Sequence, residues 1–351
     1  MAINLASKYS DKIATAFTAA SFIRGKVSSA YDLTGVKTLK VYTPQTVDEG
    51  DYTRSGTSRY GTPAEMQDTV QELTMSQDKA VSLTIDKGNQ KDQMGVKAAG
   101  RMLKLQLSEK STPAADKYAF AQFAKMAGKF VAASAKPTKS TIVSFCADVA
   151  QAMDDALVPP DNRYIALTTE MVKFLWLSDE FIKLEALGVK SVSRGECGEI
   201  FGMRVIRVPA SYLPADCYAI AWYKEAVLMP YKIEDAKIHE DAPGISGSLL
   251  EIRHYYDAFV LGAKCNGVVA LVLSSKRQAT PTLSISANAV TPTSASASEI
   301  KYTIDGTDPR YSDTAKVSSG EITLGSGVTI KAVAYGATGY FTSDVASATN
   351  S

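Results

Sequence analysis

Residues 36–85 read VKTLKVYTPQTVDEGDYTRSGTSRYGTPAEMQDTVQELTMSQDKAVSLTI, and the organisation of the whole chain can be worked out from this stretch. Its two ends, Val36–Tyr42 and Val70–Ile85, are predicted to be strands, because apolar and polar residues alternate in them. The 26 residues Thr43–Asp68 between these strands are rich in Thr, Ser, Gly and charged residues. A loop of this length is uncommon in a compact domain and is normally either functional or disordered. The stretch therefore predicts an oversized hairpin that does not pack on its own domain.

The residues that follow predict a mixture of helices and strands. Thr112-Pro113 is typical of a helix start, and an apolar stripe continues the helix to Val131. A second helix, Ser140–Leu157, stops at Val158-Pro159-Pro160. The other predicted elements are a helix at Glu170–Leu184, strands at Tyr164–Leu167, Met203–Val208, Tyr218–Trp222, Ala226–Ile233 and Leu249–Tyr256, and a hairpin of Ala258–Lys264 with Val268–Val272 around Asn266-Gly267. This order predicts an α+β body with mostly antiparallel or irregular strands, not a regular βαβ series.

The composition changes near residue 273. In residues 281–351, 39 of 71 positions are Ser, Thr, Ala or Gly, and short apolar runs alternate with turn signals. Val328–Tyr335 shows the period of two that is typical of a strand. The polar junction 273–280 precedes Pro281 and is predicted to be a linker. The last 71 residues are therefore predicted to be a separate all-β domain.

Charge and composition exclude several classes of protein. The chain has 351 residues, and its 38 Lys+Arg against 37 Asp+Glu leave a net charge of +1, so a protein that reads nucleic acid directly is not expected. The four cysteines have no zinc-like spacing and are expected to be free thiols in a reducing cytosol. The first residues do not predict a signal peptide, and no apolar run is long enough to span a membrane.

No arrangement of residues predicts catalysis. The sequence lacks a P-loop, an HExxH zinc motif, a GxSxG elbow and an EF-hand loop. Residues that carry chemistry in other proteins have structural interpretations here: Gly195, Gly198 and Gly202 as backbone turns, Asp154-Asp155 as a solvated helix end, Asp305, Asp308 and Asp313 as turn caps in preference to a calcium site, and His254 as a structural residue in a strand. We therefore predict a protein that is not an enzyme, with no catalytic residue, cofactor-binding residue or metal site.

The order of elements in residues 1–272 resembles the HK97-fold major capsid proteins of tailed bacteriophages. The residues that carry the resemblance are the hairpin Val36–Ile85, the helix Thr112–Val131, and the stretch Gly198-Glu-Ile-Phe-Gly202 that leads into a strand. The resemblance implies an N-terminal arm (1–35), an extended loop (36–85), a spine helix (about 112–133), an axial domain (about 140–225) and a return to the peripheral domain (about 226–272). It also implies assembly of the chain into hexamers and pentamers.

In some of these capsid proteins, a lysine of the extended loop forms an isopeptide bond with an asparagine of a neighbouring subunit. This chain has no lysine between Lys40 and Lys79, where only Arg54 and Arg59 carry positive charge. We therefore predict that its shells are not crosslinked and give no ladder on a denaturing gel. The chain also lacks a long helical segment at its start, so we expect scaffolding to come from a separate protein.

Residues 281–351 resemble the small immunoglobulin-like domain at the C-terminus of chitobiase-type and other surface enzymes. The matching residues are Ile300–Pro309, Val328–Tyr335 and Gly339–Val345. Such domains are usually accessory and sometimes bind glycans. Tyr302, Tyr311, Tyr335 and Tyr340 are candidate sugar-stacking residues, although packing in the domain core is the expected use for most of them. On a shell the domain is expected to project outward, and deleting it is expected to leave assembly intact.

The predicted function is therefore that of a major capsid protein, made in the bacterial cytoplasm and located in the virion. The expected partners are further copies of the chain, a portal protein, a separate scaffolding protein, a maturation protease, packaged double-stranded DNA in non-specific contact, and glycans at the outer domain, but no membrane. Alternatives are a phage tail-tube protein with an immunoglobulin-like domain, an encapsulin-like nanocompartment shell, and a secreted carbohydrate-binding protein. The predicted helices argue against the tube, and the missing export signal argues against the secreted protein.

Overall fold

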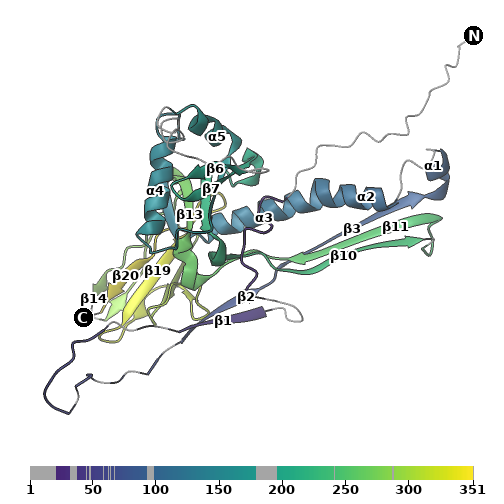
Figure 1. Cartoon of the computed structure of the whole chain (residues 1–351). Helices are drawn as coiled ribbons and strands as arrows, with labels where there is room; N and C mark the ends of the chain where they lie inside the picture. The colour runs from purple at the N-terminus through teal and green to yellow at the C-terminus, as the bar shows by residue number, and fades with distance from the viewer. Residues whose placement is uncertain are drawn as a thin grey trace, which may run out of the picture.

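The structure is a computed structural model, and Figure 1 shows that it has three parts. The body contains the main sheet with helices α4 (Ile142–Asp154) and α5 (Thr169–Trp176). A long arm of helix and strands extends to one side of this body, and the C-terminal strands lie on another side. The described residues are 21–31, 38–44, 46, 49–57, 59–61, 63, 65–66, 68–92, 99–178, 196–240, 242–286 and 288–350.

The body is built on a six-stranded sheet in the order β4-β13-β8-β5-β7-β6. The β4–β13 and β5–β7 pairs are parallel and the other pairs are antiparallel, as expected for an α+β fold. The strands of this sheet are β4 (Lys129–Ala133), β5 (Arg163–Thr168), β6 (Glu196–Ile200), β7 (Met203–Val208), β8 (Cys217–Tyr223) and β13 (Val268–Leu273).

Both faces of this sheet are covered by helices, so its central strands are apolar on both sides. Val268 and Ala270 of β13 face the core under helix α3 (Thr112–Lys125), while Val269 and Leu271 face the core under α4 and α5. Helix α4 covers Ile142–Asp154, within the predicted Ser140–Leu157. Helix α5 covers Thr169–Trp176, and residues 179–195, which include the end of its predicted range and Gly195, lie outside the described residues.

The long helix begins earlier than the sequence predicts. It consists of α2 (Ala99–Gln106), a π-helical turn η1 (Leu107–Ser111) and α3 (Thr112–Lys125) in direct succession. The helix start predicted at Thr112 is wrong, because Ser111 before it is itself helical and makes no side-chain cap. Pro113 lies just after the π-helical turn η1. Proline has no N–H to donate within a helix, and the wider turn before it allows the helix to continue through this residue.

The same helix also ends earlier than predicted, at Lys125 instead of residues 131–133. The N–H of Gly128 donates to the carbonyl oxygens of Cys265 and Val268, so the chain joins the edge of the main sheet at this residue. A Cβ at Gly128 would lie 2.2 Å from the Cys265 oxygen, so only glycine allows this approach. Residues 129–133 are therefore strand β4.

The arm contains a three-stranded antiparallel sheet in the order β10-β11-β3, against which α2 packs. Its strands are β3 (Gln77–Asp86), β10 (Tyr231–Glu240) and β11 (Gly247–Tyr256), and the short helix α1 (Lys87–Asp92) follows β3. Along β11, buried Leu250, Ile252 and Tyr256 alternate with exposed or half-buried residues. This alternation gives the sheet one packed face and one solvent face.

The extended hairpin is formed by β1 (Thr38–Pro44) and β2 (Asp68–Thr74), which pair antiparallel over their whole length. The prediction of one strand over Val70–Ile85 is wrong, because β3 pairs with β11 and not with the hairpin. The strand breaks at Met75 and Ser76. Met75 is buried, and a carboxylate from a distant residue, Asp257, binds Ser76.

The hairpin predicted around Asn266-Gly267 is also wrong. Residues Gly262–Gly267 form the 3-10 helix η4, and β13 pairs with β8 and β4 instead. Gly267 packs closely on β8, since a Cβ there would lie 3.1 Å from the Cβ of Tyr223. The remaining short elements of this part are β9 (Val227–Leu228), β12 (Phe259–Val260), η2 (Ala210–Tyr212), η3 (Lys224–Ala226) and η5 (Ser274–Lys276).

The C-terminal residues form an all-β domain of two small sheets, as predicted. The alternation predicted for Val328–Tyr335 is seen in Ile330, Ala332 and Ala334 of β19, which are fully buried, although Val333 between them is fully buried as well. Val290, Leu324 and Ile330 form the apolar cluster between the sheets. The sheets are β14-β15-β18 and β17-β16-β19-β20, with strands β14 (Ile285–Ser286), β15 (Ala289–Val290), β16 (Glu299–Thr303), β17 (Lys316–Val317), β18 (Ile322–Thr323), β19 (Thr329–Tyr335) and β20 (Ala346–Thr349).

Candidate assembly surfaces

The distal loop of the extended hairpin projects beyond the C-terminal domain (Figure 1). Its tip is closed by a hydrogen bond of 3.0 Å from the N–H of Thr53 to the carbonyl of Arg59. The rings of Tyr52 and Tyr60 meet edge to face with centroids 5.0 Å apart, and Tyr60 is 92% exposed. Arg54 and Arg59 are exposed beside them. The tip therefore presents two aromatic rings and two cations away from the body, a combination enriched in protein interfaces.

The base of the hairpin, in contrast, is packed firmly on the body. The amide of Gln71 donates to the carbonyl of Val260 at 2.9 Å and accepts from the N–H of Gly262 at 2.7 Å. Val41 and Leu73 are buried in one apolar cluster with residues of the body. The hairpin is thus a rigid extension of the body at its base, and only its distal part lacks a partner within the described chain.

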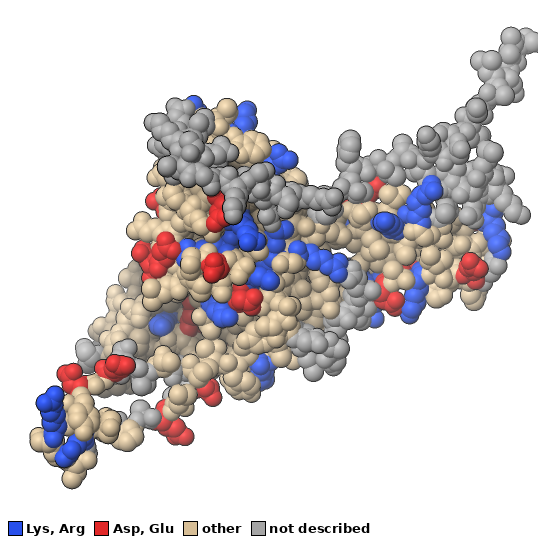
Figure 2. Space-filling model, viewed as in Figure 1, with Lys and Arg blue, Asp and Glu red and all other residues tan. Residues whose placement is uncertain are grey.

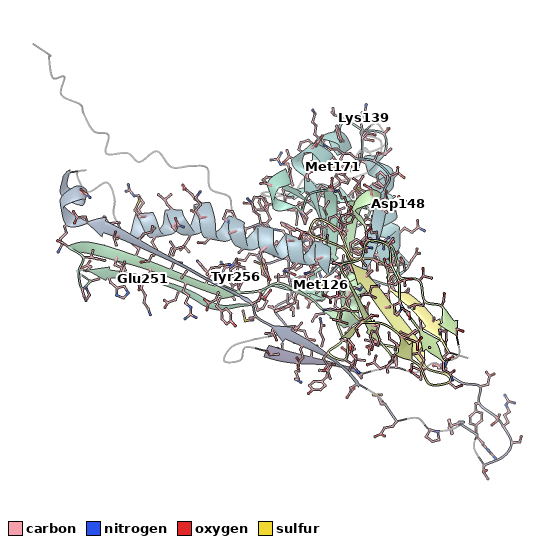
Figure 3. All side chains as sticks on the ribbon, turned by 180° about the vertical axis from the view of Figure 1, so that it is seen from behind. Met126, Lys139, Asp148, Met171, Glu251 and Tyr256 are labelled. Atoms are coloured by element: carbon pink, nitrogen blue, oxygen red, sulfur yellow. The ribbon has the colours of Figure 1, made fainter. Side chains whose placement is uncertain are left out.

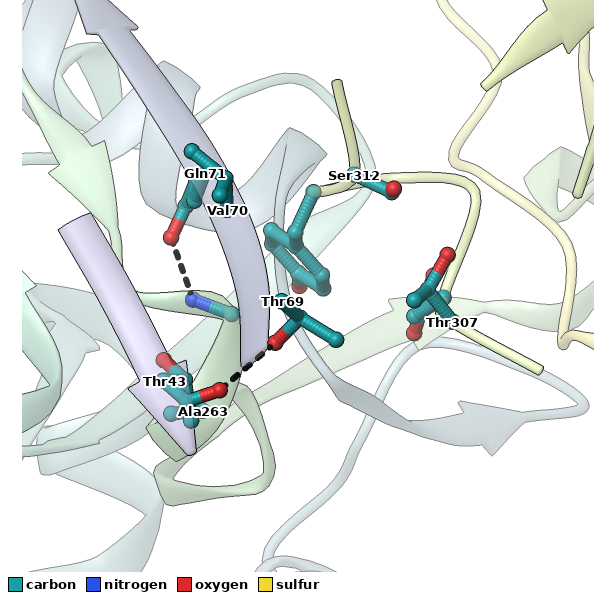
Figure 4. A pocket seen from close by; sticks show the side chains of 10 residues that line it. Thr43, Thr69, Val70, Gln71, Ala263, Thr307 and Ser312 are labelled. Carbon is teal, nitrogen blue, oxygen red and sulfur yellow. Dashed lines mark hydrogen bonds between the residues drawn. The ribbon is translucent and has the colours of Figure 1, made fainter. Parts of the chain in front are cut away.

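A small cavity of about 130 Å³ lies where the hairpin base meets the C-terminal domain (Figure 4). Thr43, Thr69 and Gln71 of the hairpin line one side, and Thr307 and Ser312 line the other. The hydroxyl of Thr69 donates to the Thr43 carbonyl at 3.2 Å, and the hydroxyls of Thr307 and Ser312 form hydrogen bonds within the C-terminal domain. The cavity is therefore a gap left where two parts of the chain pack against each other.

Asp257 joins the hairpin, the helix and the arm sheet at one point. Its carboxylate accepts from the N–H and hydroxyl of Ser76 at 2.7 and 2.9 Å, from the Tyr118 hydroxyl at 2.8 Å and from the N–H of Ala258 at 2.7 Å. Asp257 is 3% exposed. Ser76 lies between β2 and β3, and Tyr118 lies on α3, so this carboxylate sets the angle at which the hairpin leaves the arm.

The N-terminal arm is held against the helix by a second buried carboxylate. Asp116 of α3 accepts from the Ser21 hydroxyl and from the N–H of Phe22, both at 2.7 Å. Burial raises the pKa of the Asp116 carboxyl, although these two donors partly oppose the shift. Residues 1–20 and 32–37, which hold the rest of the predicted arm, lie outside the described residues.

The solvent-exposed side of the long helix is mostly basic. Arg101, Lys104, Lys110 and Lys117 are exposed, whereas Asp116 is turned inward. Figure 2 shows blue side chains along this side of the arm and toward the body. A row of cations on one helix side is the electrostatic pattern expected of weak, sequence-independent contact with phosphates.

The four candidate sugar-stacking tyrosines have different surroundings. Tyr302 packs on the apolar cluster of the C-terminal domain, and Tyr311 is buried against the body. Burial raises the pKa of Tyr335 to about 12, and Lys301 lies over its ring. Only Tyr340 is substantially open among the four, at 46% exposure, with Lys276 5.4 Å from its ring centroid. Core packing is thus confirmed as the use of Tyr302.

The other residues singled out in the sequence are structural. Gly202 has a φ of 73° in the turn between β6 and β7, which confirms the backbone-turn interpretation for this residue. The interpretation is wrong for Gly198, which has a φ of 108° inside strand β6, where the register with β7 shifts. Asp154 forms an ion pair of 2.7 Å with the buried Arg163. The carboxylate of Asp305 accepts from Thr307 at 2.5 Å and from Thr314.

Within the described residues, no group of His, Cys, Asp and Glu is arranged to hold a metal ion, and no helix is long and apolar enough to cross a membrane. Cys146, Cys217 and Cys265 are buried free thiols. The side chain of Cys197, the fourth cysteine, lies outside the described part of the chain.

Comparison with known proteins assigns the fold. The structure is similar to that of Mycobacterium phage Che8, with a TM-score of 0.59 and 18% identity over 77% of this chain and 98% of that chain. It is similar to the capsid of cyanophage P-SCSP1u (TM-score 0.62, 12% identity, 77% of this chain and 93% of that chain). It is likewise similar to the mature capsid of bacteriophage PhiM1 (TM-score 0.61, 12% identity, 77% and 92%). No curated protein matches the sequence.

The body therefore has the HK97-like fold of phage capsid subunits, as its order of elements predicted. The sequence family described as Fn3 associated matches residues 290–349 and confirms an immunoglobulin-like domain at the C-terminus. The β1–β2 hairpin lies in the part of the chain predicted to be the extended loop, and the succession α2, η1 and α3, called the spine helix below, includes the predicted spine helix.

Proposed function

We propose that the chain is the major capsid protein of a tailed phage and assembles as hexamers and pentamers into an icosahedral shell around packaged double-stranded DNA. The observation that carries this proposal is the extended hairpin. Its base is anchored by Gln71, while its tip presents Tyr52 and Tyr60 away from the body. A second copy of the chain that covers this tip gives the large interface typical of permanent assemblies, about 2,000–5,000 Å² or more.

The basic side of the spine helix supports a location for the DNA. Arg101, Lys104, Lys110 and Lys117 are exposed on a chain whose net charge is only +1. We assign this side to the inner surface of the shell, where it touches phosphates without reading bases. Four cations per subunit hold packaged DNA weakly. Weak binding is required because the shell must also release its genome.

The immunoglobulin-like domain is assigned to the outer surface. It contacts the base of the hairpin, where the N–H of Asp313 lies 3.4 Å from the Val70 carbonyl. Tyr340 is the open aromatic ring among the four candidates, and with Lys276 beside it this ring is the best candidate for weak binding of a glycan on the host surface. The expected further partners are a portal protein, a separate scaffolding protein and a maturation protease.

Two other functions use related architecture. A nanocompartment shell shares the body fold but encloses protein cargo instead of DNA. A tail-tube protein is disfavoured because the body has a long spine helix and two further helices, α4 and α5. Shells that are filled with DNA in infected cells distinguish a capsid from both alternatives.

The hairpin provides the experiment. Residues 46–66 are replaced by a short Gly-Ser linker, and both chains are purified and examined by sedimentation velocity and negative-stain imaging. The wild-type chain is expected to form closed shells, whereas the shortened chain is expected to remain a folded subunit with the same circular dichroism spectrum. Shells of normal yield from the shortened chain would contradict the proposed role of the hairpin, and stacked tubes from the wild type would favour the tail protein.

A further inference from the structure

The C-terminal domain contacts the end of the spine helix through hydrogen bonds to three successive carbonyl groups. The Thr342 hydroxyl donates to the Lys125 carbonyl at 2.9 Å. The Tyr311 hydroxyl donates to the Met126 carbonyl at 2.6 Å, and the Arg310 guanidinium donates to the Ala127 carbonyl at 2.8 Å. Figure 3 shows Met126 at the end of the helix nearest the C-terminal strands.

Lys125 is the last residue of α3 and Met126 is its C-cap, so their carbonyls belong to the helix end, and Ala127 follows directly after it. The last four carbonyls of an α-helix accept no bond from the helix itself, and the C-terminal end carries the negative end of the helix dipole. Arg310 therefore supplies both donors and a positive charge at the correct end. Its guanidinium is almost fully buried and is oriented by Asp308, whose carboxylate lies 2.7 Å away. In this chain, the cap of the spine helix comes from a different domain.

Apolar packing joins the same two parts. Tyr311 and Phe341 of the C-terminal domain belong to the core cluster that contains Phe120 and Phe123 of the spine helix. The rings of Phe341 and Phe130 lie 6.4 Å apart. Tyr311 also packs tightly on the body loop, since a Cβ at Gly262 would lie 2.7 Å from the Tyr311 Cβ. The contact is continuous with the body core, and it reaches the segment beside the hairpin base.

The junction between the two parts is itself ordered by contacts. Gln278, in the segment predicted to be a linker, is 5% exposed, and its N–H donates to the Phe341 carbonyl at 2.9 Å. Arg277 lies 5.0 Å from the centroid of the Phe130 ring and forms an ion pair with Asp344. A domain attached by a free tether has no such contacts, so the position of this domain is specified by the body.

We infer that the immunoglobulin-like domain is an intramolecular clamp, which caps the spine helix and holds the base of the extended hairpin in its position for assembly. This role goes beyond decoration and opposes the expectation that the domain can be deleted without effect on assembly. Because residues 281–351 follow the body in the chain, the clamp closes only after the body has been synthesised. The subunit thereby becomes competent for assembly only when its C-terminal domain is folded.

The test is hydrogen exchange on the unassembled full-length subunit, which does not depend on shell formation. The variants are Arg310→Leu, which removes charge and donors, and Tyr311→Phe, which removes one hydroxyl. Lys316→Ala, on an exposed strand of the same domain, is the matched control. Amides in the last turn of α3 are expected to exchange at least tenfold faster in Arg310→Leu and several-fold faster in Tyr311→Phe than in the wild type. In the control, their exchange rates are expected to be unchanged.

The comparison with helix α4, on the opposite face of the main sheet, makes the result specific. The clamp predicts a larger change at the end of α3 and in β2 than in α4. Wild-type exchange at the end of α3 in both variants, or an equal increase in α4, would overturn the inference. A third variant, Ile330→Asp, unfolds the domain from its own core. The clamp predicts that this variant also exposes the end of α3, and an unaffected body would show that the domain is an independent appendage.

Discussion

Replacing Asp257 tests whether one buried carboxylate holds the hairpin, the spine helix and the arm sheet together. Its two oxygens accept four hydrogen bonds of 2.7–2.9 Å, two from Ser76 and one each from Tyr118 and Ala258. In Asp257→Ala, the N–H of Ala258 stays buried without an acceptor, while the hydroxyl groups of Ser76 and Tyr118 can turn to water.

A hydrogen bond to a charged group contributes about 1.5–3 kcal/mol, and a buried donor left without a partner costs about 1–3 kcal/mol. Because part of this cluster reaches solvent, we expect Asp257→Ala to lower the free energy of unfolding by about 3 kcal/mol. Asp257→Asn retains one carbonyl oxygen but directs an N–H₂ group at donors, so we expect a smaller loss of about 1–2 kcal/mol.

The assay is urea unfolding of the unassembled subunit in a Trp176→Phe background, which leaves Trp222 as the fluorescent tryptophan of the two in the chain. This ring is fully buried between the main sheet and the spine helix, so its emission reports the loss of the body core. Asp78→Asn is the control, because the ion pair of Asp78 with Arg253 is exposed and such pairs contribute less than about 1 kcal/mol. The reasoning would be refuted by a loss below about 1 kcal/mol in Asp257→Ala, or by an equal loss in the control.

Three further predictions follow from buried groups of the body. Gly128→Ala places a Cβ 2.2 Å from the Cys265 oxygen, so we expect a loss of more than about 3 kcal/mol in urea unfolding, and a loss below about 1 kcal/mol would contradict this contact. Because burial raises the pKa of Asp116 above its ordinary value of 3.8, the unfolding free energy of the wild type relative to Asp116→Asn should fall as pH rises from 3.8 through the raised pKa, and a flat or rising difference would exclude the shift. Since burial raises the pKa of Cys146 and Cys217 to about 12, mass-spectrometric mapping should find both thiols unmodified by a thiol reagent at pH 8 until urea is added, and rapid labelling of the native subunit would count against this burial.

The parts of the fold that depend on local pattern could be predicted from the sequence. Helix α4 follows from a period of 3.6 in its own residues and β19 from a period of two, whereas β5, β7 and β8 were recognisable as short apolar runs. The oversized loop was recognisable because its length and polarity do not fit a compact domain. Together with their order, these elements were sufficient for the capsid fold.

The errors arose where distant residues decide the conformation. The strand break at Ser76 depends on Asp257, which lies 181 positions away in the sequence. Asn266-Gly267 has the composition of a tight turn, yet it lies at the end of η4, where Gly267 packs closely on Tyr223. The end of the helix at Lys125 is set by strand pairing and by donors from the C-terminal domain. Local patterns contain none of these partners.

The docking of the C-terminal domain was the least predictable feature of the candidate surfaces. Its polar composition is typical of an independent accessory domain. A weak signal was present in Asp308-Pro309-Arg310-Tyr311, where a large aromatic residue stands in a polar loop. A tyrosine in such a loop packs either in its own domain or on another surface, and only the structure shows that Tyr311 is buried against the spine helix.

A cryo-electron microscopy reconstruction of the particles formed by the purified chain tests the central claim most directly. We predict a closed icosahedral shell of hexamers and pentamers, with density for the loop around Tyr52 and Tyr60 lying on a neighbouring subunit and the C-terminal domain docked on the spine helix of its own subunit. Unassembled subunits, open tubes, or a shell in which this loop contacts no neighbour would contradict the account.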